Sequence, residues 1–190
     1  MKRLVMLSNS SRNMSELKNR AERLFDDRIG ALPKKVYMLG AEYTPLEFAH
    51  SVCMRGEYLA MTSFTHHSFG EAFVLEVPDN YSNELYYNVP IDVMMKRIER
   101  SLRAGHPVCW EGDTSETGFD FKRGVAELTK QRPYTQKERQ IEFENHHTTD
   151  DHCMVLIGIA HDENGKRYYI AKNSWGTGNA YNGLMYLSEE

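Results

Sequence analysis

The feature that most constrains this chain is a pair of apolar, strand-like runs joined by an Asn-Gly turn near the C-terminus. The runs are "HCMVLIGIAH", residues 152–161, and "KRYYIAKNSW", residues 166–175, with Asp162–Gly165 between them. Asn-Gly between apolar runs is a strong hairpin signal, because both residues tolerate positive φ angles. We therefore predict an antiparallel ribbon here, followed by a further strand in "GLMYLS", residues 183–188.

Upstream of this ribbon the sequence is patterned mainly for helices. Apolar spacing and capping residues predict helices over about 13–29, 45–52, 90–104 and 135–144. Strands are predicted within residues 57–77 and in "HPVCWEGD", residues 106–113, whereas residues 114–134 look irregular. Helices come first and a hairpin-rich sheet comes last, so the expected fold class is α+β.

Composition and charge exclude several classes of function. The net charge is −4 and the pI is near 6.1, so we expect no binding of nucleic acid and no membrane association. The N-terminal apolar run, Leu4–Leu7, is shorter than the roughly 7–15 residues of a signal-peptide core. Three cysteines are too few for a disulfide framework, so we expect a cytoplasmic protein with reduced thiols.

The predicted ribbon brings a histidine and an asparagine together. His152 begins the first strand and Asn173 ends the second, so the two lie nearly opposite each other at the open end of the ribbon. The side-chain oxygen of Asn173 can accept a hydrogen bond from an imidazole N–H and so fix the tautomer and orientation of the ring. That is the role of the third member of a Cys-His-Asn catalytic set.

The same residues carry a family resemblance. The segment "DDHCMVLIGIAHDENGKRYYIAKNSWG", residues 150–176, resembles the histidine-to-asparagine segment of papain-like cysteine peptidases, in which KNSWG is the most recognisable C-terminal string. The His-x-Met pairing at His152 and Met154 is similar to the bleomycin hydrolase and aminopeptidase C branch. So are "YTPLEFAHSV", residues 43–52, and the helix and strand of residues 88–119.

The resemblance implies the C-terminal portion of a papain-like fold. This portion is an antiparallel sheet or half-barrel with flanking helices, and the N-terminal portion that carries the catalytic cysteine is absent. We expect one domain over residues 1–190, with residues 1–43 as a helical lead-in and residues 44–190 as the family-like region.

The resemblance also implies roles for individual residues. His152 is the general base and imidazolium partner, Asn173 orients it, and Trp175 shields their hydrogen bond from water. No cofactor or metal is implied. The expected partners are a peptide substrate and either the missing N-terminal half or further copies of the chain, because members of this branch resemble ring-forming hexamers.

The nucleophile that the family requires has no match at the expected position. In this family the cysteine motif precedes the histidine by roughly 130–150 residues, which from His152 leads to a stretch without cysteine. The resemblance also implies a glutamine that helps to build the oxyanion hole, but no glutamine precedes a Cys-Trp or Cys-Tyr motif at suitable spacing. Enzymes of this branch extend beyond the equivalent of Glu190 into a tail that restricts cleavage to N-terminal residues.

The cysteines that are present fit the role of nucleophile poorly. A nucleophilic cysteine needs the N-terminus of a helix, where the dipole lowers the pKa of the thiol. Cys109 lies in a predicted strand, and Cys153 adjoins His152 on a strand, so its side chain points to the opposite face. Cys53 ends a short helix, where the dipole disfavours a thiolate. Each is expected to be a packed thiol.

A metal site is the rival interpretation of the histidine-rich stretch at residues 146–153. Zinc needs three or four converging ligands, whereas adjacent residues on a strand diverge, and the sequence holds no CxxC or HExxH motif. We expect no metal there, nor at His66 and His67.

Two functions follow from these observations. In the first, the chain supplies the His/Asn half of a cysteine aminopeptidase that hydrolyses peptide bonds. In the second, it is a catalytically inactive module that has lost the nucleophile and binds peptides or other subunits.

Overall fold

The computed structural model describes residues 13–54, 56–128, 132 and 134–189. The chain divides into two compact units, Met1–Tyr58 and Leu59–Glu190. The N-terminal run Leu4–Leu7 lies outside the described residues. Among the helices that are described, none is long and apolar enough to cross a membrane.

The first unit contains two helices and a small hairpin within its described residues. Its elements are α2 (Met14–Ile29), β1 (Val36–Met38), β2 (Ala41–Tyr43) and α3 (Pro45–Val52). Asn13 caps α2 by accepting a hydrogen bond from the backbone of Ser15. Thr44 and Glu47 form a capping box at the start of α3, each side chain bonded to the backbone of the other. Both predicted helices are confirmed, whereas the hairpin was not predicted.

The second unit carries the ribbon. Its helices are α4 (Ile91–Arg103) and α5 (Gln136–Glu144). Its strands are β3 (Met61–Thr62), β4 (Ala72–Val74), β5 (Leu85–Asn88), β6 (Val108–Gly112), β7 (Phe119–Asp120), β8 (Val125–Ala126), β9 (His152–His161), β10 (Arg167–Lys172) and β11 (Leu184–Ser188).

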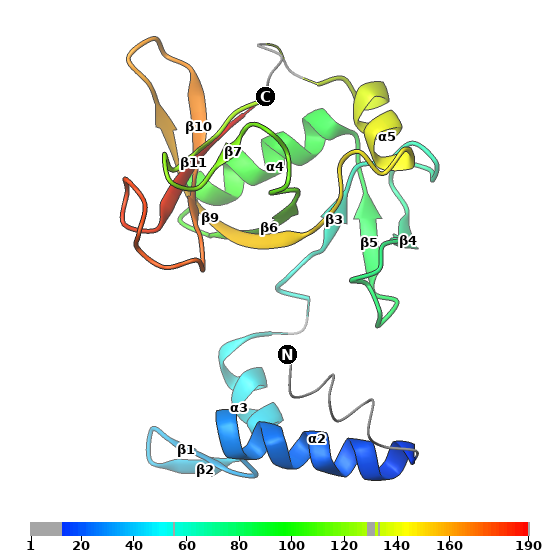
Figure 1. Cartoon of the computed structure of the whole chain (residues 1–190), viewed down its shortest axis with the longest axis vertical. Coiled ribbons are helices and arrows are strands. Elements are labelled where there is room, and N and C mark those ends of the chain that lie inside the picture. The colour runs from blue at the N-terminus through cyan, green and yellow to red at the C-terminus, as the bar shows by residue number, and fades with distance from the viewer. Residues whose placement is uncertain (1–12, 55, 129–131, 133, 190) are drawn as a thin grey trace. The chain divides into compact units, whose positions relative to one another are not determined.

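These strands form two sheets. The larger has the order β6-β9-β10-β11-β8-β7, and the smaller has the order β3-β5-β4 (Figure 1). The larger sheet is antiparallel, as expected, except where β11 pairs in parallel with β8. The short strands β5, β7 and β8 were not predicted, because segments of two to four residues are too short to show an alternating pattern.

The predicted ribbon is present, with a turn one residue wider than expected. His161 pairs with Arg167, so the loop spans residues 162–166. Gly165 has a φ of 83° and donates its N–H to the carbonyl of Asp162 at 3.1 Å. This is a conformation that glycine adopts without strain. The positive φ that made Asn164-Gly165 a turn signal is therefore used, but in a wider loop than a two-residue turn.

A β-bulge lies in the middle of the ribbon. Ile170 of β10 pairs with Gly158, but the next residue, Ala171, pairs with Leu156. Ile157 is thus an extra residue on β9 without a partner on β10. Because side chains alternate between the two faces of a strand, one extra residue exchanges the faces of everything beyond it.

The bulge decides which side chains of β9 face the core. On the C-terminal side of the bulge, near the hairpin turn, Ile159 packs against the core, as does Tyr169 opposite it. On the N-terminal side of the bulge, the core-facing positions are those of Leu156, Met154 and His152, while the residues between them are exposed.

The main core lies between α4 and the larger sheet (Figure 1). Its buried side chains are Ile98, Met154, Leu156, Tyr169, Ala171, Met185 and Leu187. A second, smaller core forms beside the β3-β5-β4 sheet around Phe64, Phe73 and Leu75, with Phe143 of α5 packed against it. The larger core fixes the strands that carry the site.

The alternation along β9 gives a test of this packing. Leu156 is 2% exposed, whereas its neighbour Val155 is 38% exposed on the other face. We expect Leu156→Ala to lower the free energy of unfolding by about 2–5 kcal/mol and Val155→Ala to lower it by about 1 kcal/mol or less. Urea unfolding followed by the fluorescence of Trp110 and Trp175 measures both. Equal losses would show that β9 does not alternate as described.

Candidate active site

The open end of the ribbon holds the two residues that the sequence singled out. His152, the first residue of β9, is half-buried, and Asn173, directly after β10, is 7% exposed. His152 Nε2 lies 2.9 Å from Asn173 Oδ1. The predicted hydrogen bond is therefore present.

The polarity of this hydrogen bond is fixed by the backbone. Asn173 Oδ1 also accepts the N–H of Ser174 at 2.7 Å, and a backbone N–H can only donate. The atom facing Ser174 and His152 must therefore be the oxygen of Asn173, and Nε2 of His152 must carry the proton. In the neutral ring Nδ1 is then the unprotonated nitrogen, free to accept a proton from a neighbouring group.

The strands on either side hold both residues in place. His152 pairs with Gly112 at the end of β6. The backbone N–H of Asn173 donates to the carbonyl of Gly183 at 3.1 Å, and its side-chain Nδ2 contacts Met185 Sδ at 3.3 Å. Gly112 has no room for a side chain, because a Cβ there would lie 2.2 Å from the Trp110 ring. The Trp110 indole thus fills the space beside the strand position opposite His152.

An aromatic wall stands against the histidine ring. The Trp175 ring lies 4.7 Å from that of His152, tilted by 35°. Phe119 and Phe121 contact Trp175 edge-on at 5.7 and 5.3 Å. Trp175 is itself 46% exposed, so it covers one side of His152 and leaves its own outer face to solvent. Such cover strengthens a hydrogen bond by keeping competing water away.

Two aspartates clamp the loop that leads into β9. Asp113 Oδ1 accepts from the N–H and hydroxyl of Ser115, both at 2.7 Å, and its Oδ2 accepts from the N–H and hydroxyl of Thr149, at 2.7 and 3.0 Å. Asp151, next to His152, accepts in the same way from the N–H and hydroxyl of Thr114, both at 2.9 Å. These reciprocal bonds join the end of β6 to the start of β9 and so place His152.

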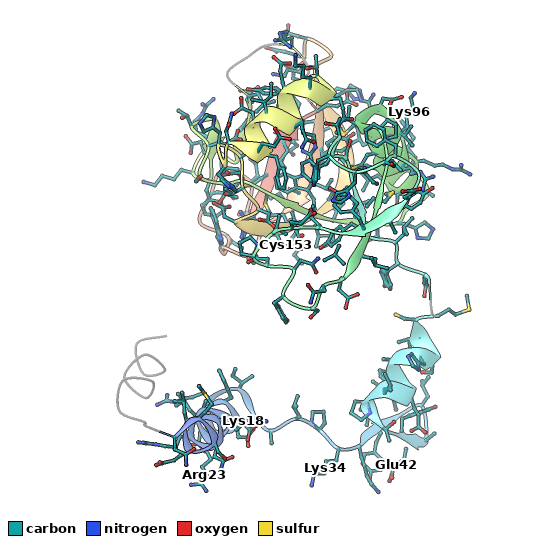
Figure 2. The ribbon with its side chains drawn as sticks, turned by 90° about the vertical axis from the view of Figure 1, so that its right-hand side faces the viewer. Lys18, Arg23, Lys34, Glu42, Lys96 and Cys153 are labelled. Carbon is teal, nitrogen blue, oxygen red and sulfur yellow. The ribbon has the colours of Figure 1, made fainter. Side chains whose placement is uncertain are left out.

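The cysteines lie on the elements that the sequence indicated, but the expectation of packed thiols was wrong for Cys109 and Cys153, which are both exposed. Cys53 caps the C-terminal end of α3. Cys109 and Cys153 lie on β6 and β9, on the exposed face of the sheet opposite the core-facing His152, and their sulfurs are 3.1 Å apart (Figure 2 labels Cys153). Cys153 therefore points away from the imidazole that adjoins it in sequence.

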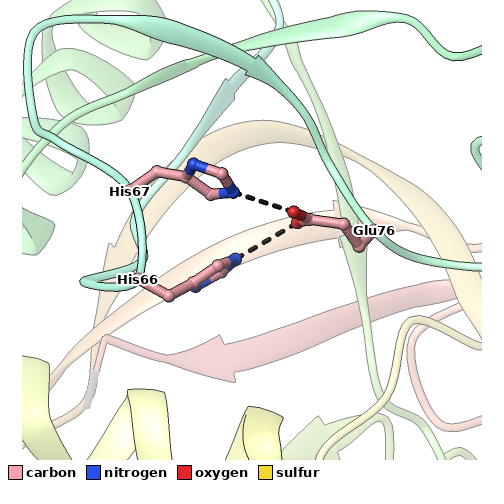
Figure 3. A group of neighbouring side chains, drawn as sticks. All are labelled: His66, His67 and Glu76. Carbon is pink, nitrogen blue, oxygen red and sulfur yellow. Dashed lines mark hydrogen bonds and ion pairs between the residues drawn. The ribbon is translucent and has the colours of Figure 1, made fainter.

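A second histidine cluster lies apart from this pair, in the same unit. Nε2 of His66 and Nε2 of His67 contact the two carboxylate oxygens of Glu76 at 3.2 and 2.8 Å (Figure 3). The three ligand atoms lie within 4.8 Å of one another, as in a site for a divalent metal. Adjacent histidines diverge on a strand, but these two lie in a loop, where both can turn toward one carboxylate.

The hydrogen bonds behind this cluster oppose a metal. Gln140 Oε1 accepts the backbone N–H of Thr65 at 2.6 Å, so the amide Nε2 of Gln140 must face His66 Nδ1, 3.0 Å away, and donate to it. A metal on His66 Nε2 would instead require a proton on Nδ1, directed at that donor. The cluster is satisfied as a hydrogen-bond network, in which Glu76 accepts from both rings.

Comparison with known proteins gives the class of this fold and site. Residues 33–190 match the Peptidase C1-like family, and the chain belongs to that family. It is a relative of the papain-like cysteine peptidases, and the predicted papain-like α+β fold is confirmed.

Two individual proteins of known identity are similar to this chain. Aminopeptidase E of Lactobacillus helveticus is 25% identical over an alignment of 169 positions that covers 82% of this chain and 38% of the relative. The crystal structure of PepW from Lactobacillus rhamnosis HN001 superimposes with a TM-score of 0.61 at 16% identity, covering 98% of this chain and 48% of that one. At that identity the similarity is one of fold. The chain spans less than half the length of either protein.

The sequence did not reveal the residues that support the site from a distance. Phe119 and Phe121 lie in a stretch that looked irregular, although two aromatic residues in alternation between glycines are a weak strand signal. Asp113 accepts four hydrogen bonds within and across this loop, which gives it a structural role.

The hydrogen bonds to the Asp113 carboxylate lead us to predict that the stability of the fold falls at acidic pH. Desolvation alone would raise the pKa of Asp113, but the hydrogen bonds from Ser115 and Thr149 outweigh it and hold the pKa below its ordinary value of 3.8. A lowered pKa stabilises the fold at any pH above the ordinary value, and this contribution is lost as the pH falls through the folded-state pKa.

We expect Asp113→Asn to lower the free energy of unfolding by about 1–3 kcal/mol at neutral pH, because an amide leaves one pair of donors without an acceptor. The difference from wild type should shrink below about pH 4, as Asp113 of the wild type protonates. Urea unfolding of both proteins, at intervals of about one pH unit between about pH 3 and 7, measures this difference in the free energy of unfolding. A difference in the free energy of unfolding that stays constant down to the lowest pH would contradict an ionised Asp113 carboxylate in the folded protein.

Proposed function

We propose that this chain provides the general base and its orienting residue in a cysteine aminopeptidase of the bleomycin hydrolase type. The single observation that carries the proposal is the hydrogen bond from His152 Nε2 to Asn173 Oδ1, with its polarity set by the N–H of Ser174. This polarity leaves Nδ1 of His152 as the atom that takes a proton. The relation to the Peptidase C1-like family supports the same reaction class.

The nucleophilic cysteine comes, in this proposal, from a segment or partner chain outside the printed sequence. His152 Nδ1 removes the thiol proton, and the resulting thiolate attacks the carbonyl carbon of the peptide bond. His152 then protonates the departing amine, which leaves an acyl-enzyme thioester. Finally His152 activates a water molecule that hydrolyses the thioester and releases the acid.

Asn173 acts in this cycle without changing its own charge. Its Oδ1 accepts from Nε2–H in both the neutral and the protonated ring, so the ring keeps one orientation while Nδ1 gains and loses a proton. Water has little access to this hydrogen bond, because Asn173 is buried and the Trp175 ring covers one side of the imidazole. The expected substrate is a peptide, and a cytoplasmic location and assembly with the cysteine-bearing half or with further copies remain predictions.

The test uses the native protein, purified from its source cells through a tag on this chain, so that any cysteine-bearing segment or partner accompanies it. Hydrolysis of a fluorogenic aminoacyl amide is measured under reducing conditions, with and without a thiol alkylator. We expect alkylator-sensitive turnover, a loss of about 10³-fold or more in His152→Ala, and a smaller loss, about 10- to 100-fold, in Asn173→Ala.

His161→Ala is the matched control, because His161 is exposed at the other end of the same strand. It should keep the wild-type rate. Turnover that survives in His152→Ala removes His152 from the mechanism. A folded native protein that binds peptides but turns over no substrate supports the alternative, a non-catalytic peptide-binding module.

A further inference from the structure

Two thiols meet on the outer face of the larger sheet. Cys109 pairs in register with Val155 and Cys153 pairs with Glu111, so the two cysteines are diagonal neighbours on β6 and β9. Their side chains turn toward each other, with Sγ to Sγ at 3.1 Å. Both residues are exposed, so small oxidants reach them.

We propose that Cys109 and Cys153 form an intramolecular disulfide when the chain meets a low-molecular-weight disulfide oxidant. The bond requires the sulfurs to approach from 3.1 Å to about 2.05 Å, which is a movement of about 1 Å. The two strands already run side by side over five consecutive residue pairs, from Val108 to Gly112 on β6. Diagonal neighbours on adjacent strands have Cα atoms about 7–8 Å apart, so closing the bond takes side-chain rotation together with a small local approach of β6 and β9.

The order of the two chemical steps follows from the surroundings of the thiols. Partial desolvation of the thiol, the hydrogen bond with Cys109 and repulsion from a Cys109 thiolate and from Glu111 raise the pKa of Cys153 to about 12. Cys109 therefore reacts first. Its thiolate attacks oxidised glutathione, forming a mixed disulfide and releasing one glutathione thiolate.

Cys153 then completes the exchange. As its proton passes to solvent, its sulfur attacks Cys109 Sγ and expels the second glutathione thiolate, which takes up a proton. The net reaction converts two protein thiols and one oxidised glutathione into one protein disulfide and two reduced glutathione molecules. The repulsion from a Cys109 thiolate has vanished by then, because that sulfur is bound to glutathione.

The cross-link would join the two strands whose ends form the site. Cys153 is the residue after His152, and Gly112, the partner of His152, lies three residues beyond Cys109 on β6. Oxidation would thus fasten β9 to β6 beside the imidazole, on the opposite face of the sheet. This inference does not depend on the proposed function, because it rests only on the two thiols and their strands.

The experiment incubates the full chain in glutathione buffers of increasing oxidised fraction, then quenches with acid and alkylates the remaining thiols. Cys53→Ser serves as the background, so that only the two sheet cysteines can react. We expect the intact mass to fall by two hydrogen atoms, with both alkylation sites lost together. Reduction should reverse the change, and the thermal midpoint of the oxidised form should be higher.

Variants and peptide mapping decide the outcome. In the Cys53→Ser background, Cys109→Ser and Cys153→Ser should each stop at a single glutathionyl adduct or a free thiol. Peptide mapping of the wild-type chain should recover Cys109 linked to Cys153, which gives the same answer without any variant. Two glutathionyl groups on one chain, or two thiols that stay free throughout the series, would overturn the proposal.

Discussion

The site depends on one extra residue in β9. Side chains on β10 alternate regularly, which puts Tyr169, Ala171 and Asn173 on the face toward the core. On β9 the bulge at Ile157 exchanges the faces, so that His152 shares the face of Asn173 instead of the opposite one. Packing fixes this arrangement, because the same exchange buries Leu156 and Met154. The hydrophobic core and the candidate active site therefore select the same register, and neither can shift without the other.

The chemistry of the pair depends on the neutrality of Asn173. A carboxylate in that place would bind an imidazolium more strongly and favour the protonated ring. An amide oxygen that also accepts the N–H of Ser174 can accept from Nε2–H in both protonation states and adds no charge of its own. The surrounding residues also hold the imidazole in one position. Asp113 and Asp151, bonded to Thr149 and Thr114, fix the start of β9, and the aromatic wall limits the access of water to the His152–Asn173 hydrogen bond. A neutral amide thus holds the imidazole of the proposed base directly, while the two carboxylates hydrogen-bond to Thr114, Ser115 and Thr149 in the loop.

Much of this arrangement could be predicted from the sequence, because it rests on local signals. The Thr44 and Thr135 caps, the apolar face of α4 and the Asn164-Gly165 turn define elements within a few residues. The hairpin alone placed His152 and Asn173 at the same end of the ribbon, whereas the bulge puts their side chains on the same face. The bulge was not predicted, although a glycine inside a strand, here Gly158, is a weak signal for one; its register also depends on the burial of Leu156 and Met154 in the core. The contacts of Phe119, Phe121 and Asp113 were equally hidden, because they join segments that are distant in sequence.

The central claim is that the fold presents His152 with its Nε2 proton held by Asn173 and its Nδ1 open to accept a proton. Nitrogen-15 NMR of the imidazole, recorded on the purified chain at a pH where the ring is neutral, tests this directly. We predict a protonated Nε2 with a hydrogen-bonded signal and an unprotonated Nδ1. A neutral ring that carries its proton on Nδ1 would contradict the account, because the atom assigned to take a proton would then already hold one.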